Sequence, residues 1–209
     1  MPQPALPPPL QPIGPLLAAV AGDLIQLEAP MWLTHAPGCM DLLGGPGEHT
    51  GSTSLLIPVN RAVYSAIQNR EDDQIHIRIL GTEEDGGPQE WSGVISDIYT
   101  KKGPPRSLAI LRDLFEESGA IWMMRLMAAM IGLRRTHQLN TPKVGFSLVV
   151  WSRLPLNGGF NAKTAFATSV SLALKAATGV DIKRVDGVRI ARAVVHGAEE
   201  VLGEKMPIA

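Results

Sequence analysis

A glycine pair lies between a strand-like stretch and a helix-like stretch late in the chain, an arrangement able to hold a phosphate group. The β-branched run 144–151 precedes the pair Gly158–Gly159, and a helical pattern follows it. In that pattern Phe166 and Val170 share one face, and Gly179 provides a stop. Unpaired backbone N–H groups and the helix dipole both point at a ligand bound at a helix N-terminus. An ordinary glycine turn that binds nothing stays an open alternative. The candidate phosphate-binding residues are Gly158, Gly159, Phe160, Asn161, Ala162, Lys163 and Thr164.

A second stretch with side chains suited to binding lies about a hundred residues earlier, between positions 36 and 52. It is dense in small residues and is predicted to be a loop. Two acids, Asp41 and Glu48, and one histidine, His49, lie in it. Such side chains can accept hydrogen bonds from ligand hydroxyl groups, and charged acceptors bind more strongly than neutral ones. Two plainer roles also stay open, because Asp41 could cap a turn and His49 could be an ordinary loop histidine.

Composition limits the classes of protein to which the chain can belong. Its 209 residues, 45% of them hydrophobic, are enough to bury a core in one domain, with or without a tail. A formal net charge of −1 with mixed signs predicts no binding to nucleic acid or to an anionic membrane. The single cysteine, Cys39, excludes an intrachain disulfide and a zinc site built from cysteines. Without a membrane-length apolar run or a basic signal start, we expect a soluble, cytoplasmic protein.

The chain begins with a proline-rich segment. Residues 1–15 contain seven prolines and no charged side chain. Proline favours the polyproline II conformation and cannot donate to a helix or a sheet. We therefore predict a disordered tail over residues 1–22 and a folded domain over residues 23–209. A ligand for an SH3-type domain is the alternative for the tail.

The rest of the pattern mixes strands with helices, which predicts an α/β fold. The clearest strand is 74–80, where Ile75, Ile77 and Ile79 alternate with polar residues. The methionine-rich helix 120–135 is interpreted as core filler and not as a ligand site. The other predicted strands are 24–28, 31–34 with its end at Pro37 and Gly38, 55–67 with an interruption at Pro58, and 91–98. The other predicted helices are 106–117 and 185–202, the second with Val188 in its apolar stripe and Gly203 as its stop.

Two motifs taken together resemble those of the galacto-homoserine-mevalonate-phosphomevalonate (GHMP) kinases. The first is similar to the sugar-binding motif of galactokinase and of its L-arabinokinase-like relatives, and the second to the ATP-phosphate loop of the family. The first comprises Ala36-Pro37-Gly38, Gly44-Gly45 and Glu48-His49-Thr50-Gly51-Ser52, and the second is the stretch 154–165. The resemblance runs in consistent order from about residue 24 to residue 203.

The resemblance implies a fold, an activity and a set of site residues. The fold is that of a GHMP-kinase N-terminal domain: an α/β (α+β two-layer) domain whose mixed sheet is backed by helices. The activity is ATP-dependent phosphorylation of a monosaccharide, galactose-like or arabinose-like, at a hydroxyl group that is expected to be the anomeric one. ATP and Mg²⁺ are the implied cofactors. Trp122 falls on the family's tryptophan helix, and Glu199 falls at its magnesium glutamate. The implied substrate-binding residues are Asp41, Glu48, His49 and Gly51.

The chain also departs from the family pattern. Cys39 stands where the family has an arginine, and Lys163 stands where it has a serine hydroxyl for magnesium. The family's catalytic aspartate, expected about a dozen residues after Glu199, and its C-terminal domain both fall beyond Ala209. The resemblance therefore leaves two alternatives open, a fragment of a sugar kinase and a protein that no longer catalyses.

Two further functions are alternatives. The stretch 157–164 nearly matches the P-loop of nucleotide triphosphatases, but Asn157 and Ala162 replace both of its glycines. That interpretation also leaves the stretch 36–52 without a role. The other alternative is a non-catalytic sugar- or nucleotide-binding domain whose proline-rich tail meets a partner.

Overall fold

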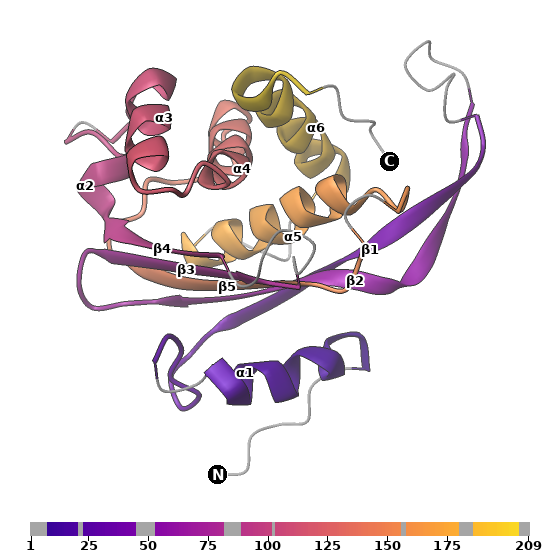
Figure 1. Cartoon of the computed structure of the whole chain (residues 1–209), viewed down its shortest axis with the longest axis horizontal. Helices are drawn as coiled ribbons and strands as arrows, with labels where there is room; N and C mark the ends of the chain where they lie inside the picture. Colours follow the sequence, from indigo (N-terminus) through magenta and orange to yellow (C-terminus); the bar gives the residue numbers. More distant parts are fainter. Residues whose placement is uncertain are drawn as a thin grey trace.

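In the described part of the chain, a five-stranded mixed sheet carries most of the helices on one face and a short N-terminal helical segment on the other (Figure 1). The computed structural model describes residues 8–20, 23–44, 53–81, 89–101, 103–155, 158–179 and 186–204. The predicted α/β fold, a mixed sheet backed by helices, is confirmed.

The sheet has the order β1-β2-β5-β3-β4. Strands β3 and β5 pair in parallel, and the other neighbours pair antiparallel. The strand bounds are β1 Trp32–Leu43, β2 Leu55–Asn69, β3 Gln74–Leu80, β4 Gln89–Val94 and β5 Phe146–Ser152. The central strand β5 is apolar along most of its length because both of its faces are covered. Leu148 and Val150 belong to the core under the helices, whereas Val149 belongs to the core on the opposite face.

The helices that follow β4 lie on one side of the sheet (Figure 1). Their bounds are α2 Ile95–Ile98, α3 Leu108–Glu117, α4 Met123–Arg135, α5 Ala162–Ala177 and α6 Gly187–Gly197, and a π-helical turn, η5, continues α6 over Ala198–Leu202. Ile75, Ile77 and Ile79 of β3 face this layer and are at most 3% exposed, as their alternation predicts. Met123 and Met127 of α4 are fully buried, so this helix is core filler, as predicted.

Helices α4 and α6 approach each other at two glycines. A Cβ atom added at Gly132 of α4 would collide with the carbonyl oxygen of Ala193, and one added at Gly197 of α6 would collide with that of Ala128. The missing side chains therefore let the two backbones touch. In α6 the apolar stripe differs from the prediction, because Val188 is 59% exposed while Ile190 and Ala193 are buried.

The predicted disordered tail is wrong for residues 8–20. A 3₁₀-helix, η1 (Pro8–Ile13), leads into α1 (Gly14–Val20), and both lie against the face of the sheet that the other helices leave open (Figure 1). Ile13 is 0% and Leu17 4% exposed, in a cluster with Tyr64 and Val149. The prolines suggest an unordered segment, but the four-residue spacing of Ile13 and Leu17 places both side chains on one side of a helix, which is buried. Residues 1–7 lie outside the described part of the chain.

Strand β1 is longer than predicted. It continues through Pro37 and Gly38 to Leu43, so that residues 36–43 are strand and not loop. A register shift between Pro37 and Cys39 accommodates the proline, and Pro58 pairs opposite Cys39 without ending β2. Pattern reasoning treated both prolines as breaks, whereas a long two-stranded ribbon tolerates them at an irregularity.

Two further strand predictions are corrected. Residues 24–28 form turns and not an extended segment, and the side-chain amide of Gln68 donates to the carbonyl oxygen of Gln26 at 2.8 Å to hold them. The predicted strand 91–98 ends at Val94 and gives way to α2. Asp97 explains the change, because its carboxylate accepts a hydrogen bond from the Val94 N–H at 2.9 Å and caps the turn. None of the helices in the described ranges combines the length and apolarity that crossing a membrane requires.

Candidate functional site

The glycine loop leaves β5 at Ser152 and enters α5 at Ala162, as the sequence predicts. The Ser152 hydroxyl donates to the carbonyl oxygen of Leu154 at 3.1 Å and accepts from its N–H at 3.2 Å, which bends the chain away from the sheet. Gly159 and Asn161 then adopt left-handed backbone angles, with φ of 72° and 53°. Asparagine is among the few residues that tolerate this conformation, so it can stand here in place of glycine.

The start of α5 is open to a ligand. The first N–H groups of a helix have no partner within it, and the side chain of Asn161 does not cap them. Gly158 and Gly159 are exposed. Together with the helix dipole, these groups form a surface that favours an anion.

Helix α5 is fixed to the sheet behind this loop. The Ser169 hydroxyl lies 2.8 Å from the Ser65 hydroxyl of β2, and the Thr34 hydroxyl of β1 donates to the Ser169 carbonyl oxygen at 2.9 Å. Both serines are fully buried. These contacts determine where the helix begins, and so where an anion would be held.

The loop contacts the first sequence motif directly. The backbone N–H of Cys39 donates to the carbonyl oxygen of Phe160 at 3.1 Å. A Cβ atom added at Gly38 would lie 2.5 Å from Leu154 Cδ2 and 2.9 Å from Phe160 O, so glycine is required for this approach. The Ala-Pro-Gly segment and the glycine loop are therefore neighbours, although more than a hundred residues separate them in sequence.

A largely apolar pocket lies beside the start of α5. Trp122 and Phe166 supply its aromatic surface, and Lys163, Arg125 and Glu204 supply its charges. Its cavity volume is only about 40 Å³, room for a few water molecules. A ring the size of a purine can enter only if the side chains at its edge move.

Lys163 is already paired. Its Nζ lies 2.8 Å from Oε1 of Glu204, in an ion pair whose side chains are 48% and 33% exposed. Glu204 is held in place because Gly203 turns the chain at a φ of 66° and the Glu204 N–H donates to the Ala198 carbonyl oxygen at 3.3 Å. Sequence reasoning missed Glu204, although Gly203 was predicted as the stop that precedes it.

Of the four predicted substrate-binding residues, Asp41 alone belongs to the described part of the chain. Asp41 is exposed on β1, two residues after Cys39. Glu48, His49 and Gly51 lie outside the described residues, so their relation to the loop stays a prediction.

The predicted metal residue, Glu199, is an exposed side chain in η5. Its neighbour Glu200 pairs with Arg135 at 2.6 Å, whereas no ion pair engages Glu199 within the described ranges. Those ranges also contain no group of three or more histidine, cysteine, aspartate or glutamate residues that could hold a metal on their own.

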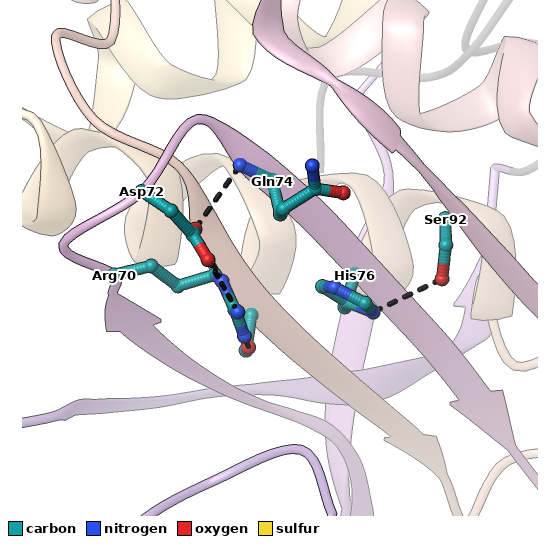
Figure 2. Close-up of polar contacts among 6 residues, drawn as sticks. Arg70, Asp72, Gln74, His76 and Ser92 are labelled. Atoms are coloured by element: carbon teal, nitrogen blue, oxygen red, sulfur yellow. Dashed lines mark hydrogen bonds and ion pairs between the residues drawn. The ribbon is translucent and has the colours of Figure 1, made fainter.

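A second polar cluster lies at the opposite end of the sheet and has a structural role (Figure 2). Arg70 donates to both carboxylate oxygens of Asp72 at 2.7 Å, and this lowers the pKa of Asp72 to about 2. The Gln74 N–H also donates to Asp72, at 3.1 Å. These bonds close the turn between β2 and β3. Since β3 and β5 run parallel, this turn lies beside the start of β5, whereas the glycine loop follows its end.

The sequence matches no protein-family model and no curated protein. Solved structures do resemble this fold. Galactokinase from Lactococcus lactis, complexed with galactose, matches with a TM-score of 0.65 at 14% identity, over 95% of this chain and 44% of that chain. Mevalonate kinase from Methanococcus jannaschii matches with a TM-score of 0.62 at 13% identity, over 85% and 49%. A putative sugar kinase from Campylobacter jejuni matches with a TM-score of 0.51 at 14% identity, over 85% and 49%.

This chain therefore spans about half the length of the kinases it resembles. At such low identity the likeness concerns the fold. The mixed five-stranded sheet with its layer of helices is the fold expected for the N-terminal part of a GHMP kinase.

Proposed function

We propose that this chain binds ATP, and that it forms the nucleotide- and sugar-binding half of a kinase that phosphorylates a monosaccharide. The observation that carries the proposal is the contact between the two motifs. The Cys39 N–H binds the Phe160 carbonyl oxygen, so the segment that resembles a sugar-binding motif lies against the loop that resembles a phosphate-binding one. A kinase requires this juxtaposition, because phosphoryl transfer depends mainly on positioning the acceptor beside the terminal phosphate.

The nucleotide phosphates bind at the loop from Gly158 to Thr164. Backbone N–H groups at the start of α5 provide the donors, and the ammonium of Lys163 adds a charge. The adenine ring then enters the neighbouring pocket once the side chains at its edge move, and Trp122 and Phe166 offer it aromatic faces for stacking. The neighbouring charges and the apolar lining match a ligand that is anionic at one end and aromatic at the other.

The sugar binds on the β1 side of the loop. Asp41 is exposed there and free to accept hydrogen bonds from sugar hydroxyls. Glu48, His49 and Gly51 belong to the same motif and are proposed to complete the sugar site. A galactose-like or arabinose-like monosaccharide phosphorylated at its anomeric hydroxyl is the substrate to test first.

The carboxylate of Glu199 could hold Mg²⁺ only together with the phosphates of the nucleotide. Mg²⁺ is commonly held by one or two carboxylates plus phosphate oxygens and water, so a single exposed carboxylate is sufficient. Glu199 meets that description, and no larger set of ligands exists among the described residues. When bound, the ion would neutralise the charge of the phosphates. The work of this chain is to bind and orient the nucleotide.

A second function, binding without catalysis, is favoured by one residue. Cys39 touches the loop through its N–H but brings no fixed positive charge to it, whereas a transferring phosphoryl group is stabilised by cations. A regulatory domain that senses a nucleotide or a sugar would need the same pocket and no such cation.

Calorimetry tests the proposal and separates the two functions. The protein is titrated with ATP in the presence of Mg²⁺, with and without galactose and L-arabinose, and sugar phosphate is then assayed. Saturable ATP binding that a sugar strengthens supports the proposed site, and sugar phosphate formation identifies the kinase. ATP binding without sugar phosphate supports the sensor. No ATP binding up to millimolar concentration contradicts both the kinase and the nucleotide sensor.

A further inference from the structure

We propose that Glu204 is an internal competitor for the phosphate site, so that the nucleotide must displace its carboxylate from Lys163. This inference rests on the proposed function, since it concerns the regulation of the same site. It follows from the geometry of the Lys163–Glu204 pair, from its place at the start of α5, and from the narrowness of the pocket that both residues line.

The position of Glu204 is determined by its own segment. Val201 is 3% exposed and anchors η5 in the helical layer, and Leu202 lines the pocket. Gly203, in the left-handed conformation, reverses the chain, and the Glu204 N–H is bonded to the Ala198 carbonyl oxygen at 3.3 Å. A fixed turn therefore positions the carboxylate at the start of α5.

The start of α5 is where a carboxylate and a phosphate would compete. Lys163 is the second residue of this helix, where the dipole disfavours a cation and favours an anion. Glu204 compensates both, because it neutralises the ammonium and places negative charge near the helix start. A nucleotide phosphate would make the same two interactions. The carboxylate and the phosphate repel each other at the same ammonium group, so the two anions compete for it.

The pair also forms part of the lining of the narrow pocket. Lys163 and Glu204 both line it, together with Trp122 and Phe166, and its cavity volume is about 40 Å³. Breaking the pair frees both side chains, which are 48% and 33% exposed, to turn outward into water. The same event therefore exposes the cation for phosphates and opens the way to the aromatic surface.

The experiment compares Glu204→Gln, which removes the charge and keeps the shape, with the unchanged protein. ATP and inorganic tripolyphosphate are the two probes, and affinity is measured by calorimetry at low ionic strength. Glu200→Gln is the matched control, because Glu200 lies in the neighbouring turn and pairs with Arg135 instead. Lys163→Met and the double variant Lys163→Met/Glu204→Gln complete a cycle. Glu204→Ala is a second variant, and thermal melting verifies that each protein folds.

Glu204→Gln is expected to bind both probes about two- to fivefold more tightly, the range that breaking an exposed ion pair allows. The gain should vanish in the Lys163→Met background and shrink towards 1 M salt, where screening is strong. Glu200→Gln should bind as the unchanged protein does. Unchanged or weaker binding of both probes by Glu204→Gln and Glu204→Ala overturns the inference.

The two probes keep the two proposals distinguishable. If no protein binds ATP while Glu204→Gln still binds tripolyphosphate more tightly, the nucleotide function is overturned and the competitor role stands. If ATP binds, and ATP and tripolyphosphate each bind equally to the unchanged protein and to Glu204→Gln, the nucleotide function stands and the competitor role is overturned. Binding of neither probe by any variant overturns both.

Discussion

The N–H of Cys39 donates to the carbonyl oxygen of Phe160 at 3.1 Å, which joins the middle of β1 to the glycine loop before α5. A backbone bond holds the two segments at a fixed separation whatever side chain residue 39 carries. The side chain of this residue therefore projects from a position that touches the candidate phosphate loop, and changing it should alter the charge of the site without altering its framework.

Cys39→Arg should strengthen ATP binding. An arginine at this position adds a planar, permanently charged donor group beside the loop, and phosphate is a preferred partner of that group. We expect a gain of about fivefold or more at low ionic strength, measured by calorimetry. Cys39→Ser, which adds no charge, is the control and should leave the affinity unchanged. Equal affinities for all three proteins would show that residue 39 does not face the phosphates.

Lys163→Met should weaken ATP binding. The substitution removes the cation at the second residue of α5 and keeps an unbranched side chain there. A charge-assisted hydrogen bond contributes about 1.5–3 kcal/mol, so a loss of roughly tenfold or more is expected in calorimetry. Lys143→Met is the matched control, since Lys143 precedes β5 and lies far from the loop that follows it. An identical loss in both variants would point to a general charge effect and against a contact at Lys163.

Gly132→Ala should destabilise the protein. The added methyl group meets the Ala193 carbonyl oxygen and forces α4 away from α6. Overpacking of this kind costs about 1–3 kcal/mol of unfolding free energy, which urea denaturation can measure. Gly187→Ala is the control: no atom from another part of the described chain lies within 4 Å of the added Cβ, and α6 should gain about 0.4–1 kcal/mol. A neutral Gly132→Ala would mean that the two helices can separate without loss.

Ile13→Ala should destabilise the protein although it lies in the proline-rich N-terminal region. Ile13 is 0% exposed against the outer face of the sheet, and truncating a buried isoleucine to alanine costs about 2–5 kcal/mol. Ile110→Ala, at a residue that is 49% exposed on α3, should change stability by about 0.5 kcal/mol or less. If the two variants unfold at the same urea concentration, η1 and α1 do not cover the sheet in solution.

Stability should depend on Asp72 at low pH. Arg70 holds the pKa of this carboxyl at about 2 in the folded protein, below its ordinary value of 3.8. The folded state therefore favours the charged form, and the stability this contributes is present above about pH 4 and is lost as pH falls towards 2. Between pH 5 and about pH 2, the melting temperature of Asp72→Asn should fall less than that of the unchanged protein. Parallel pH profiles for the two proteins would contradict the assignment.

Local pattern was enough to locate several elements and the candidate loop. The alternation of Ile75, Ile77 and Ile79 predicts a half-buried strand because side chains alternate between the faces of a sheet. The order of strand, glycine pair and helix around Gly158 is likewise a property of consecutive residues, and β5, the loop and α5 follow it. The end of α4 at Arg135 and its separation from α3 near Gly119 were also predictable, whereas the helix begins at Met123 and not at residue 120.

Local sequence pattern does not predict contacts between distant segments. Pro37 and Pro58 locally favour the end of a strand, whereas cross-strand pairing continues β1 and β2 past them. Ile13 and Leu17 lie in a proline-rich segment, and only the open face of the sheet makes it favourable to order them. Glu204 carried no signal of its own, because its role depends on Lys163, which the folded chain brings to within 2.8 Å of it. Period and turn chemistry are properties of neighbouring residues, whereas a pocket is built from residues whose separation in sequence has no bearing on their distance in space.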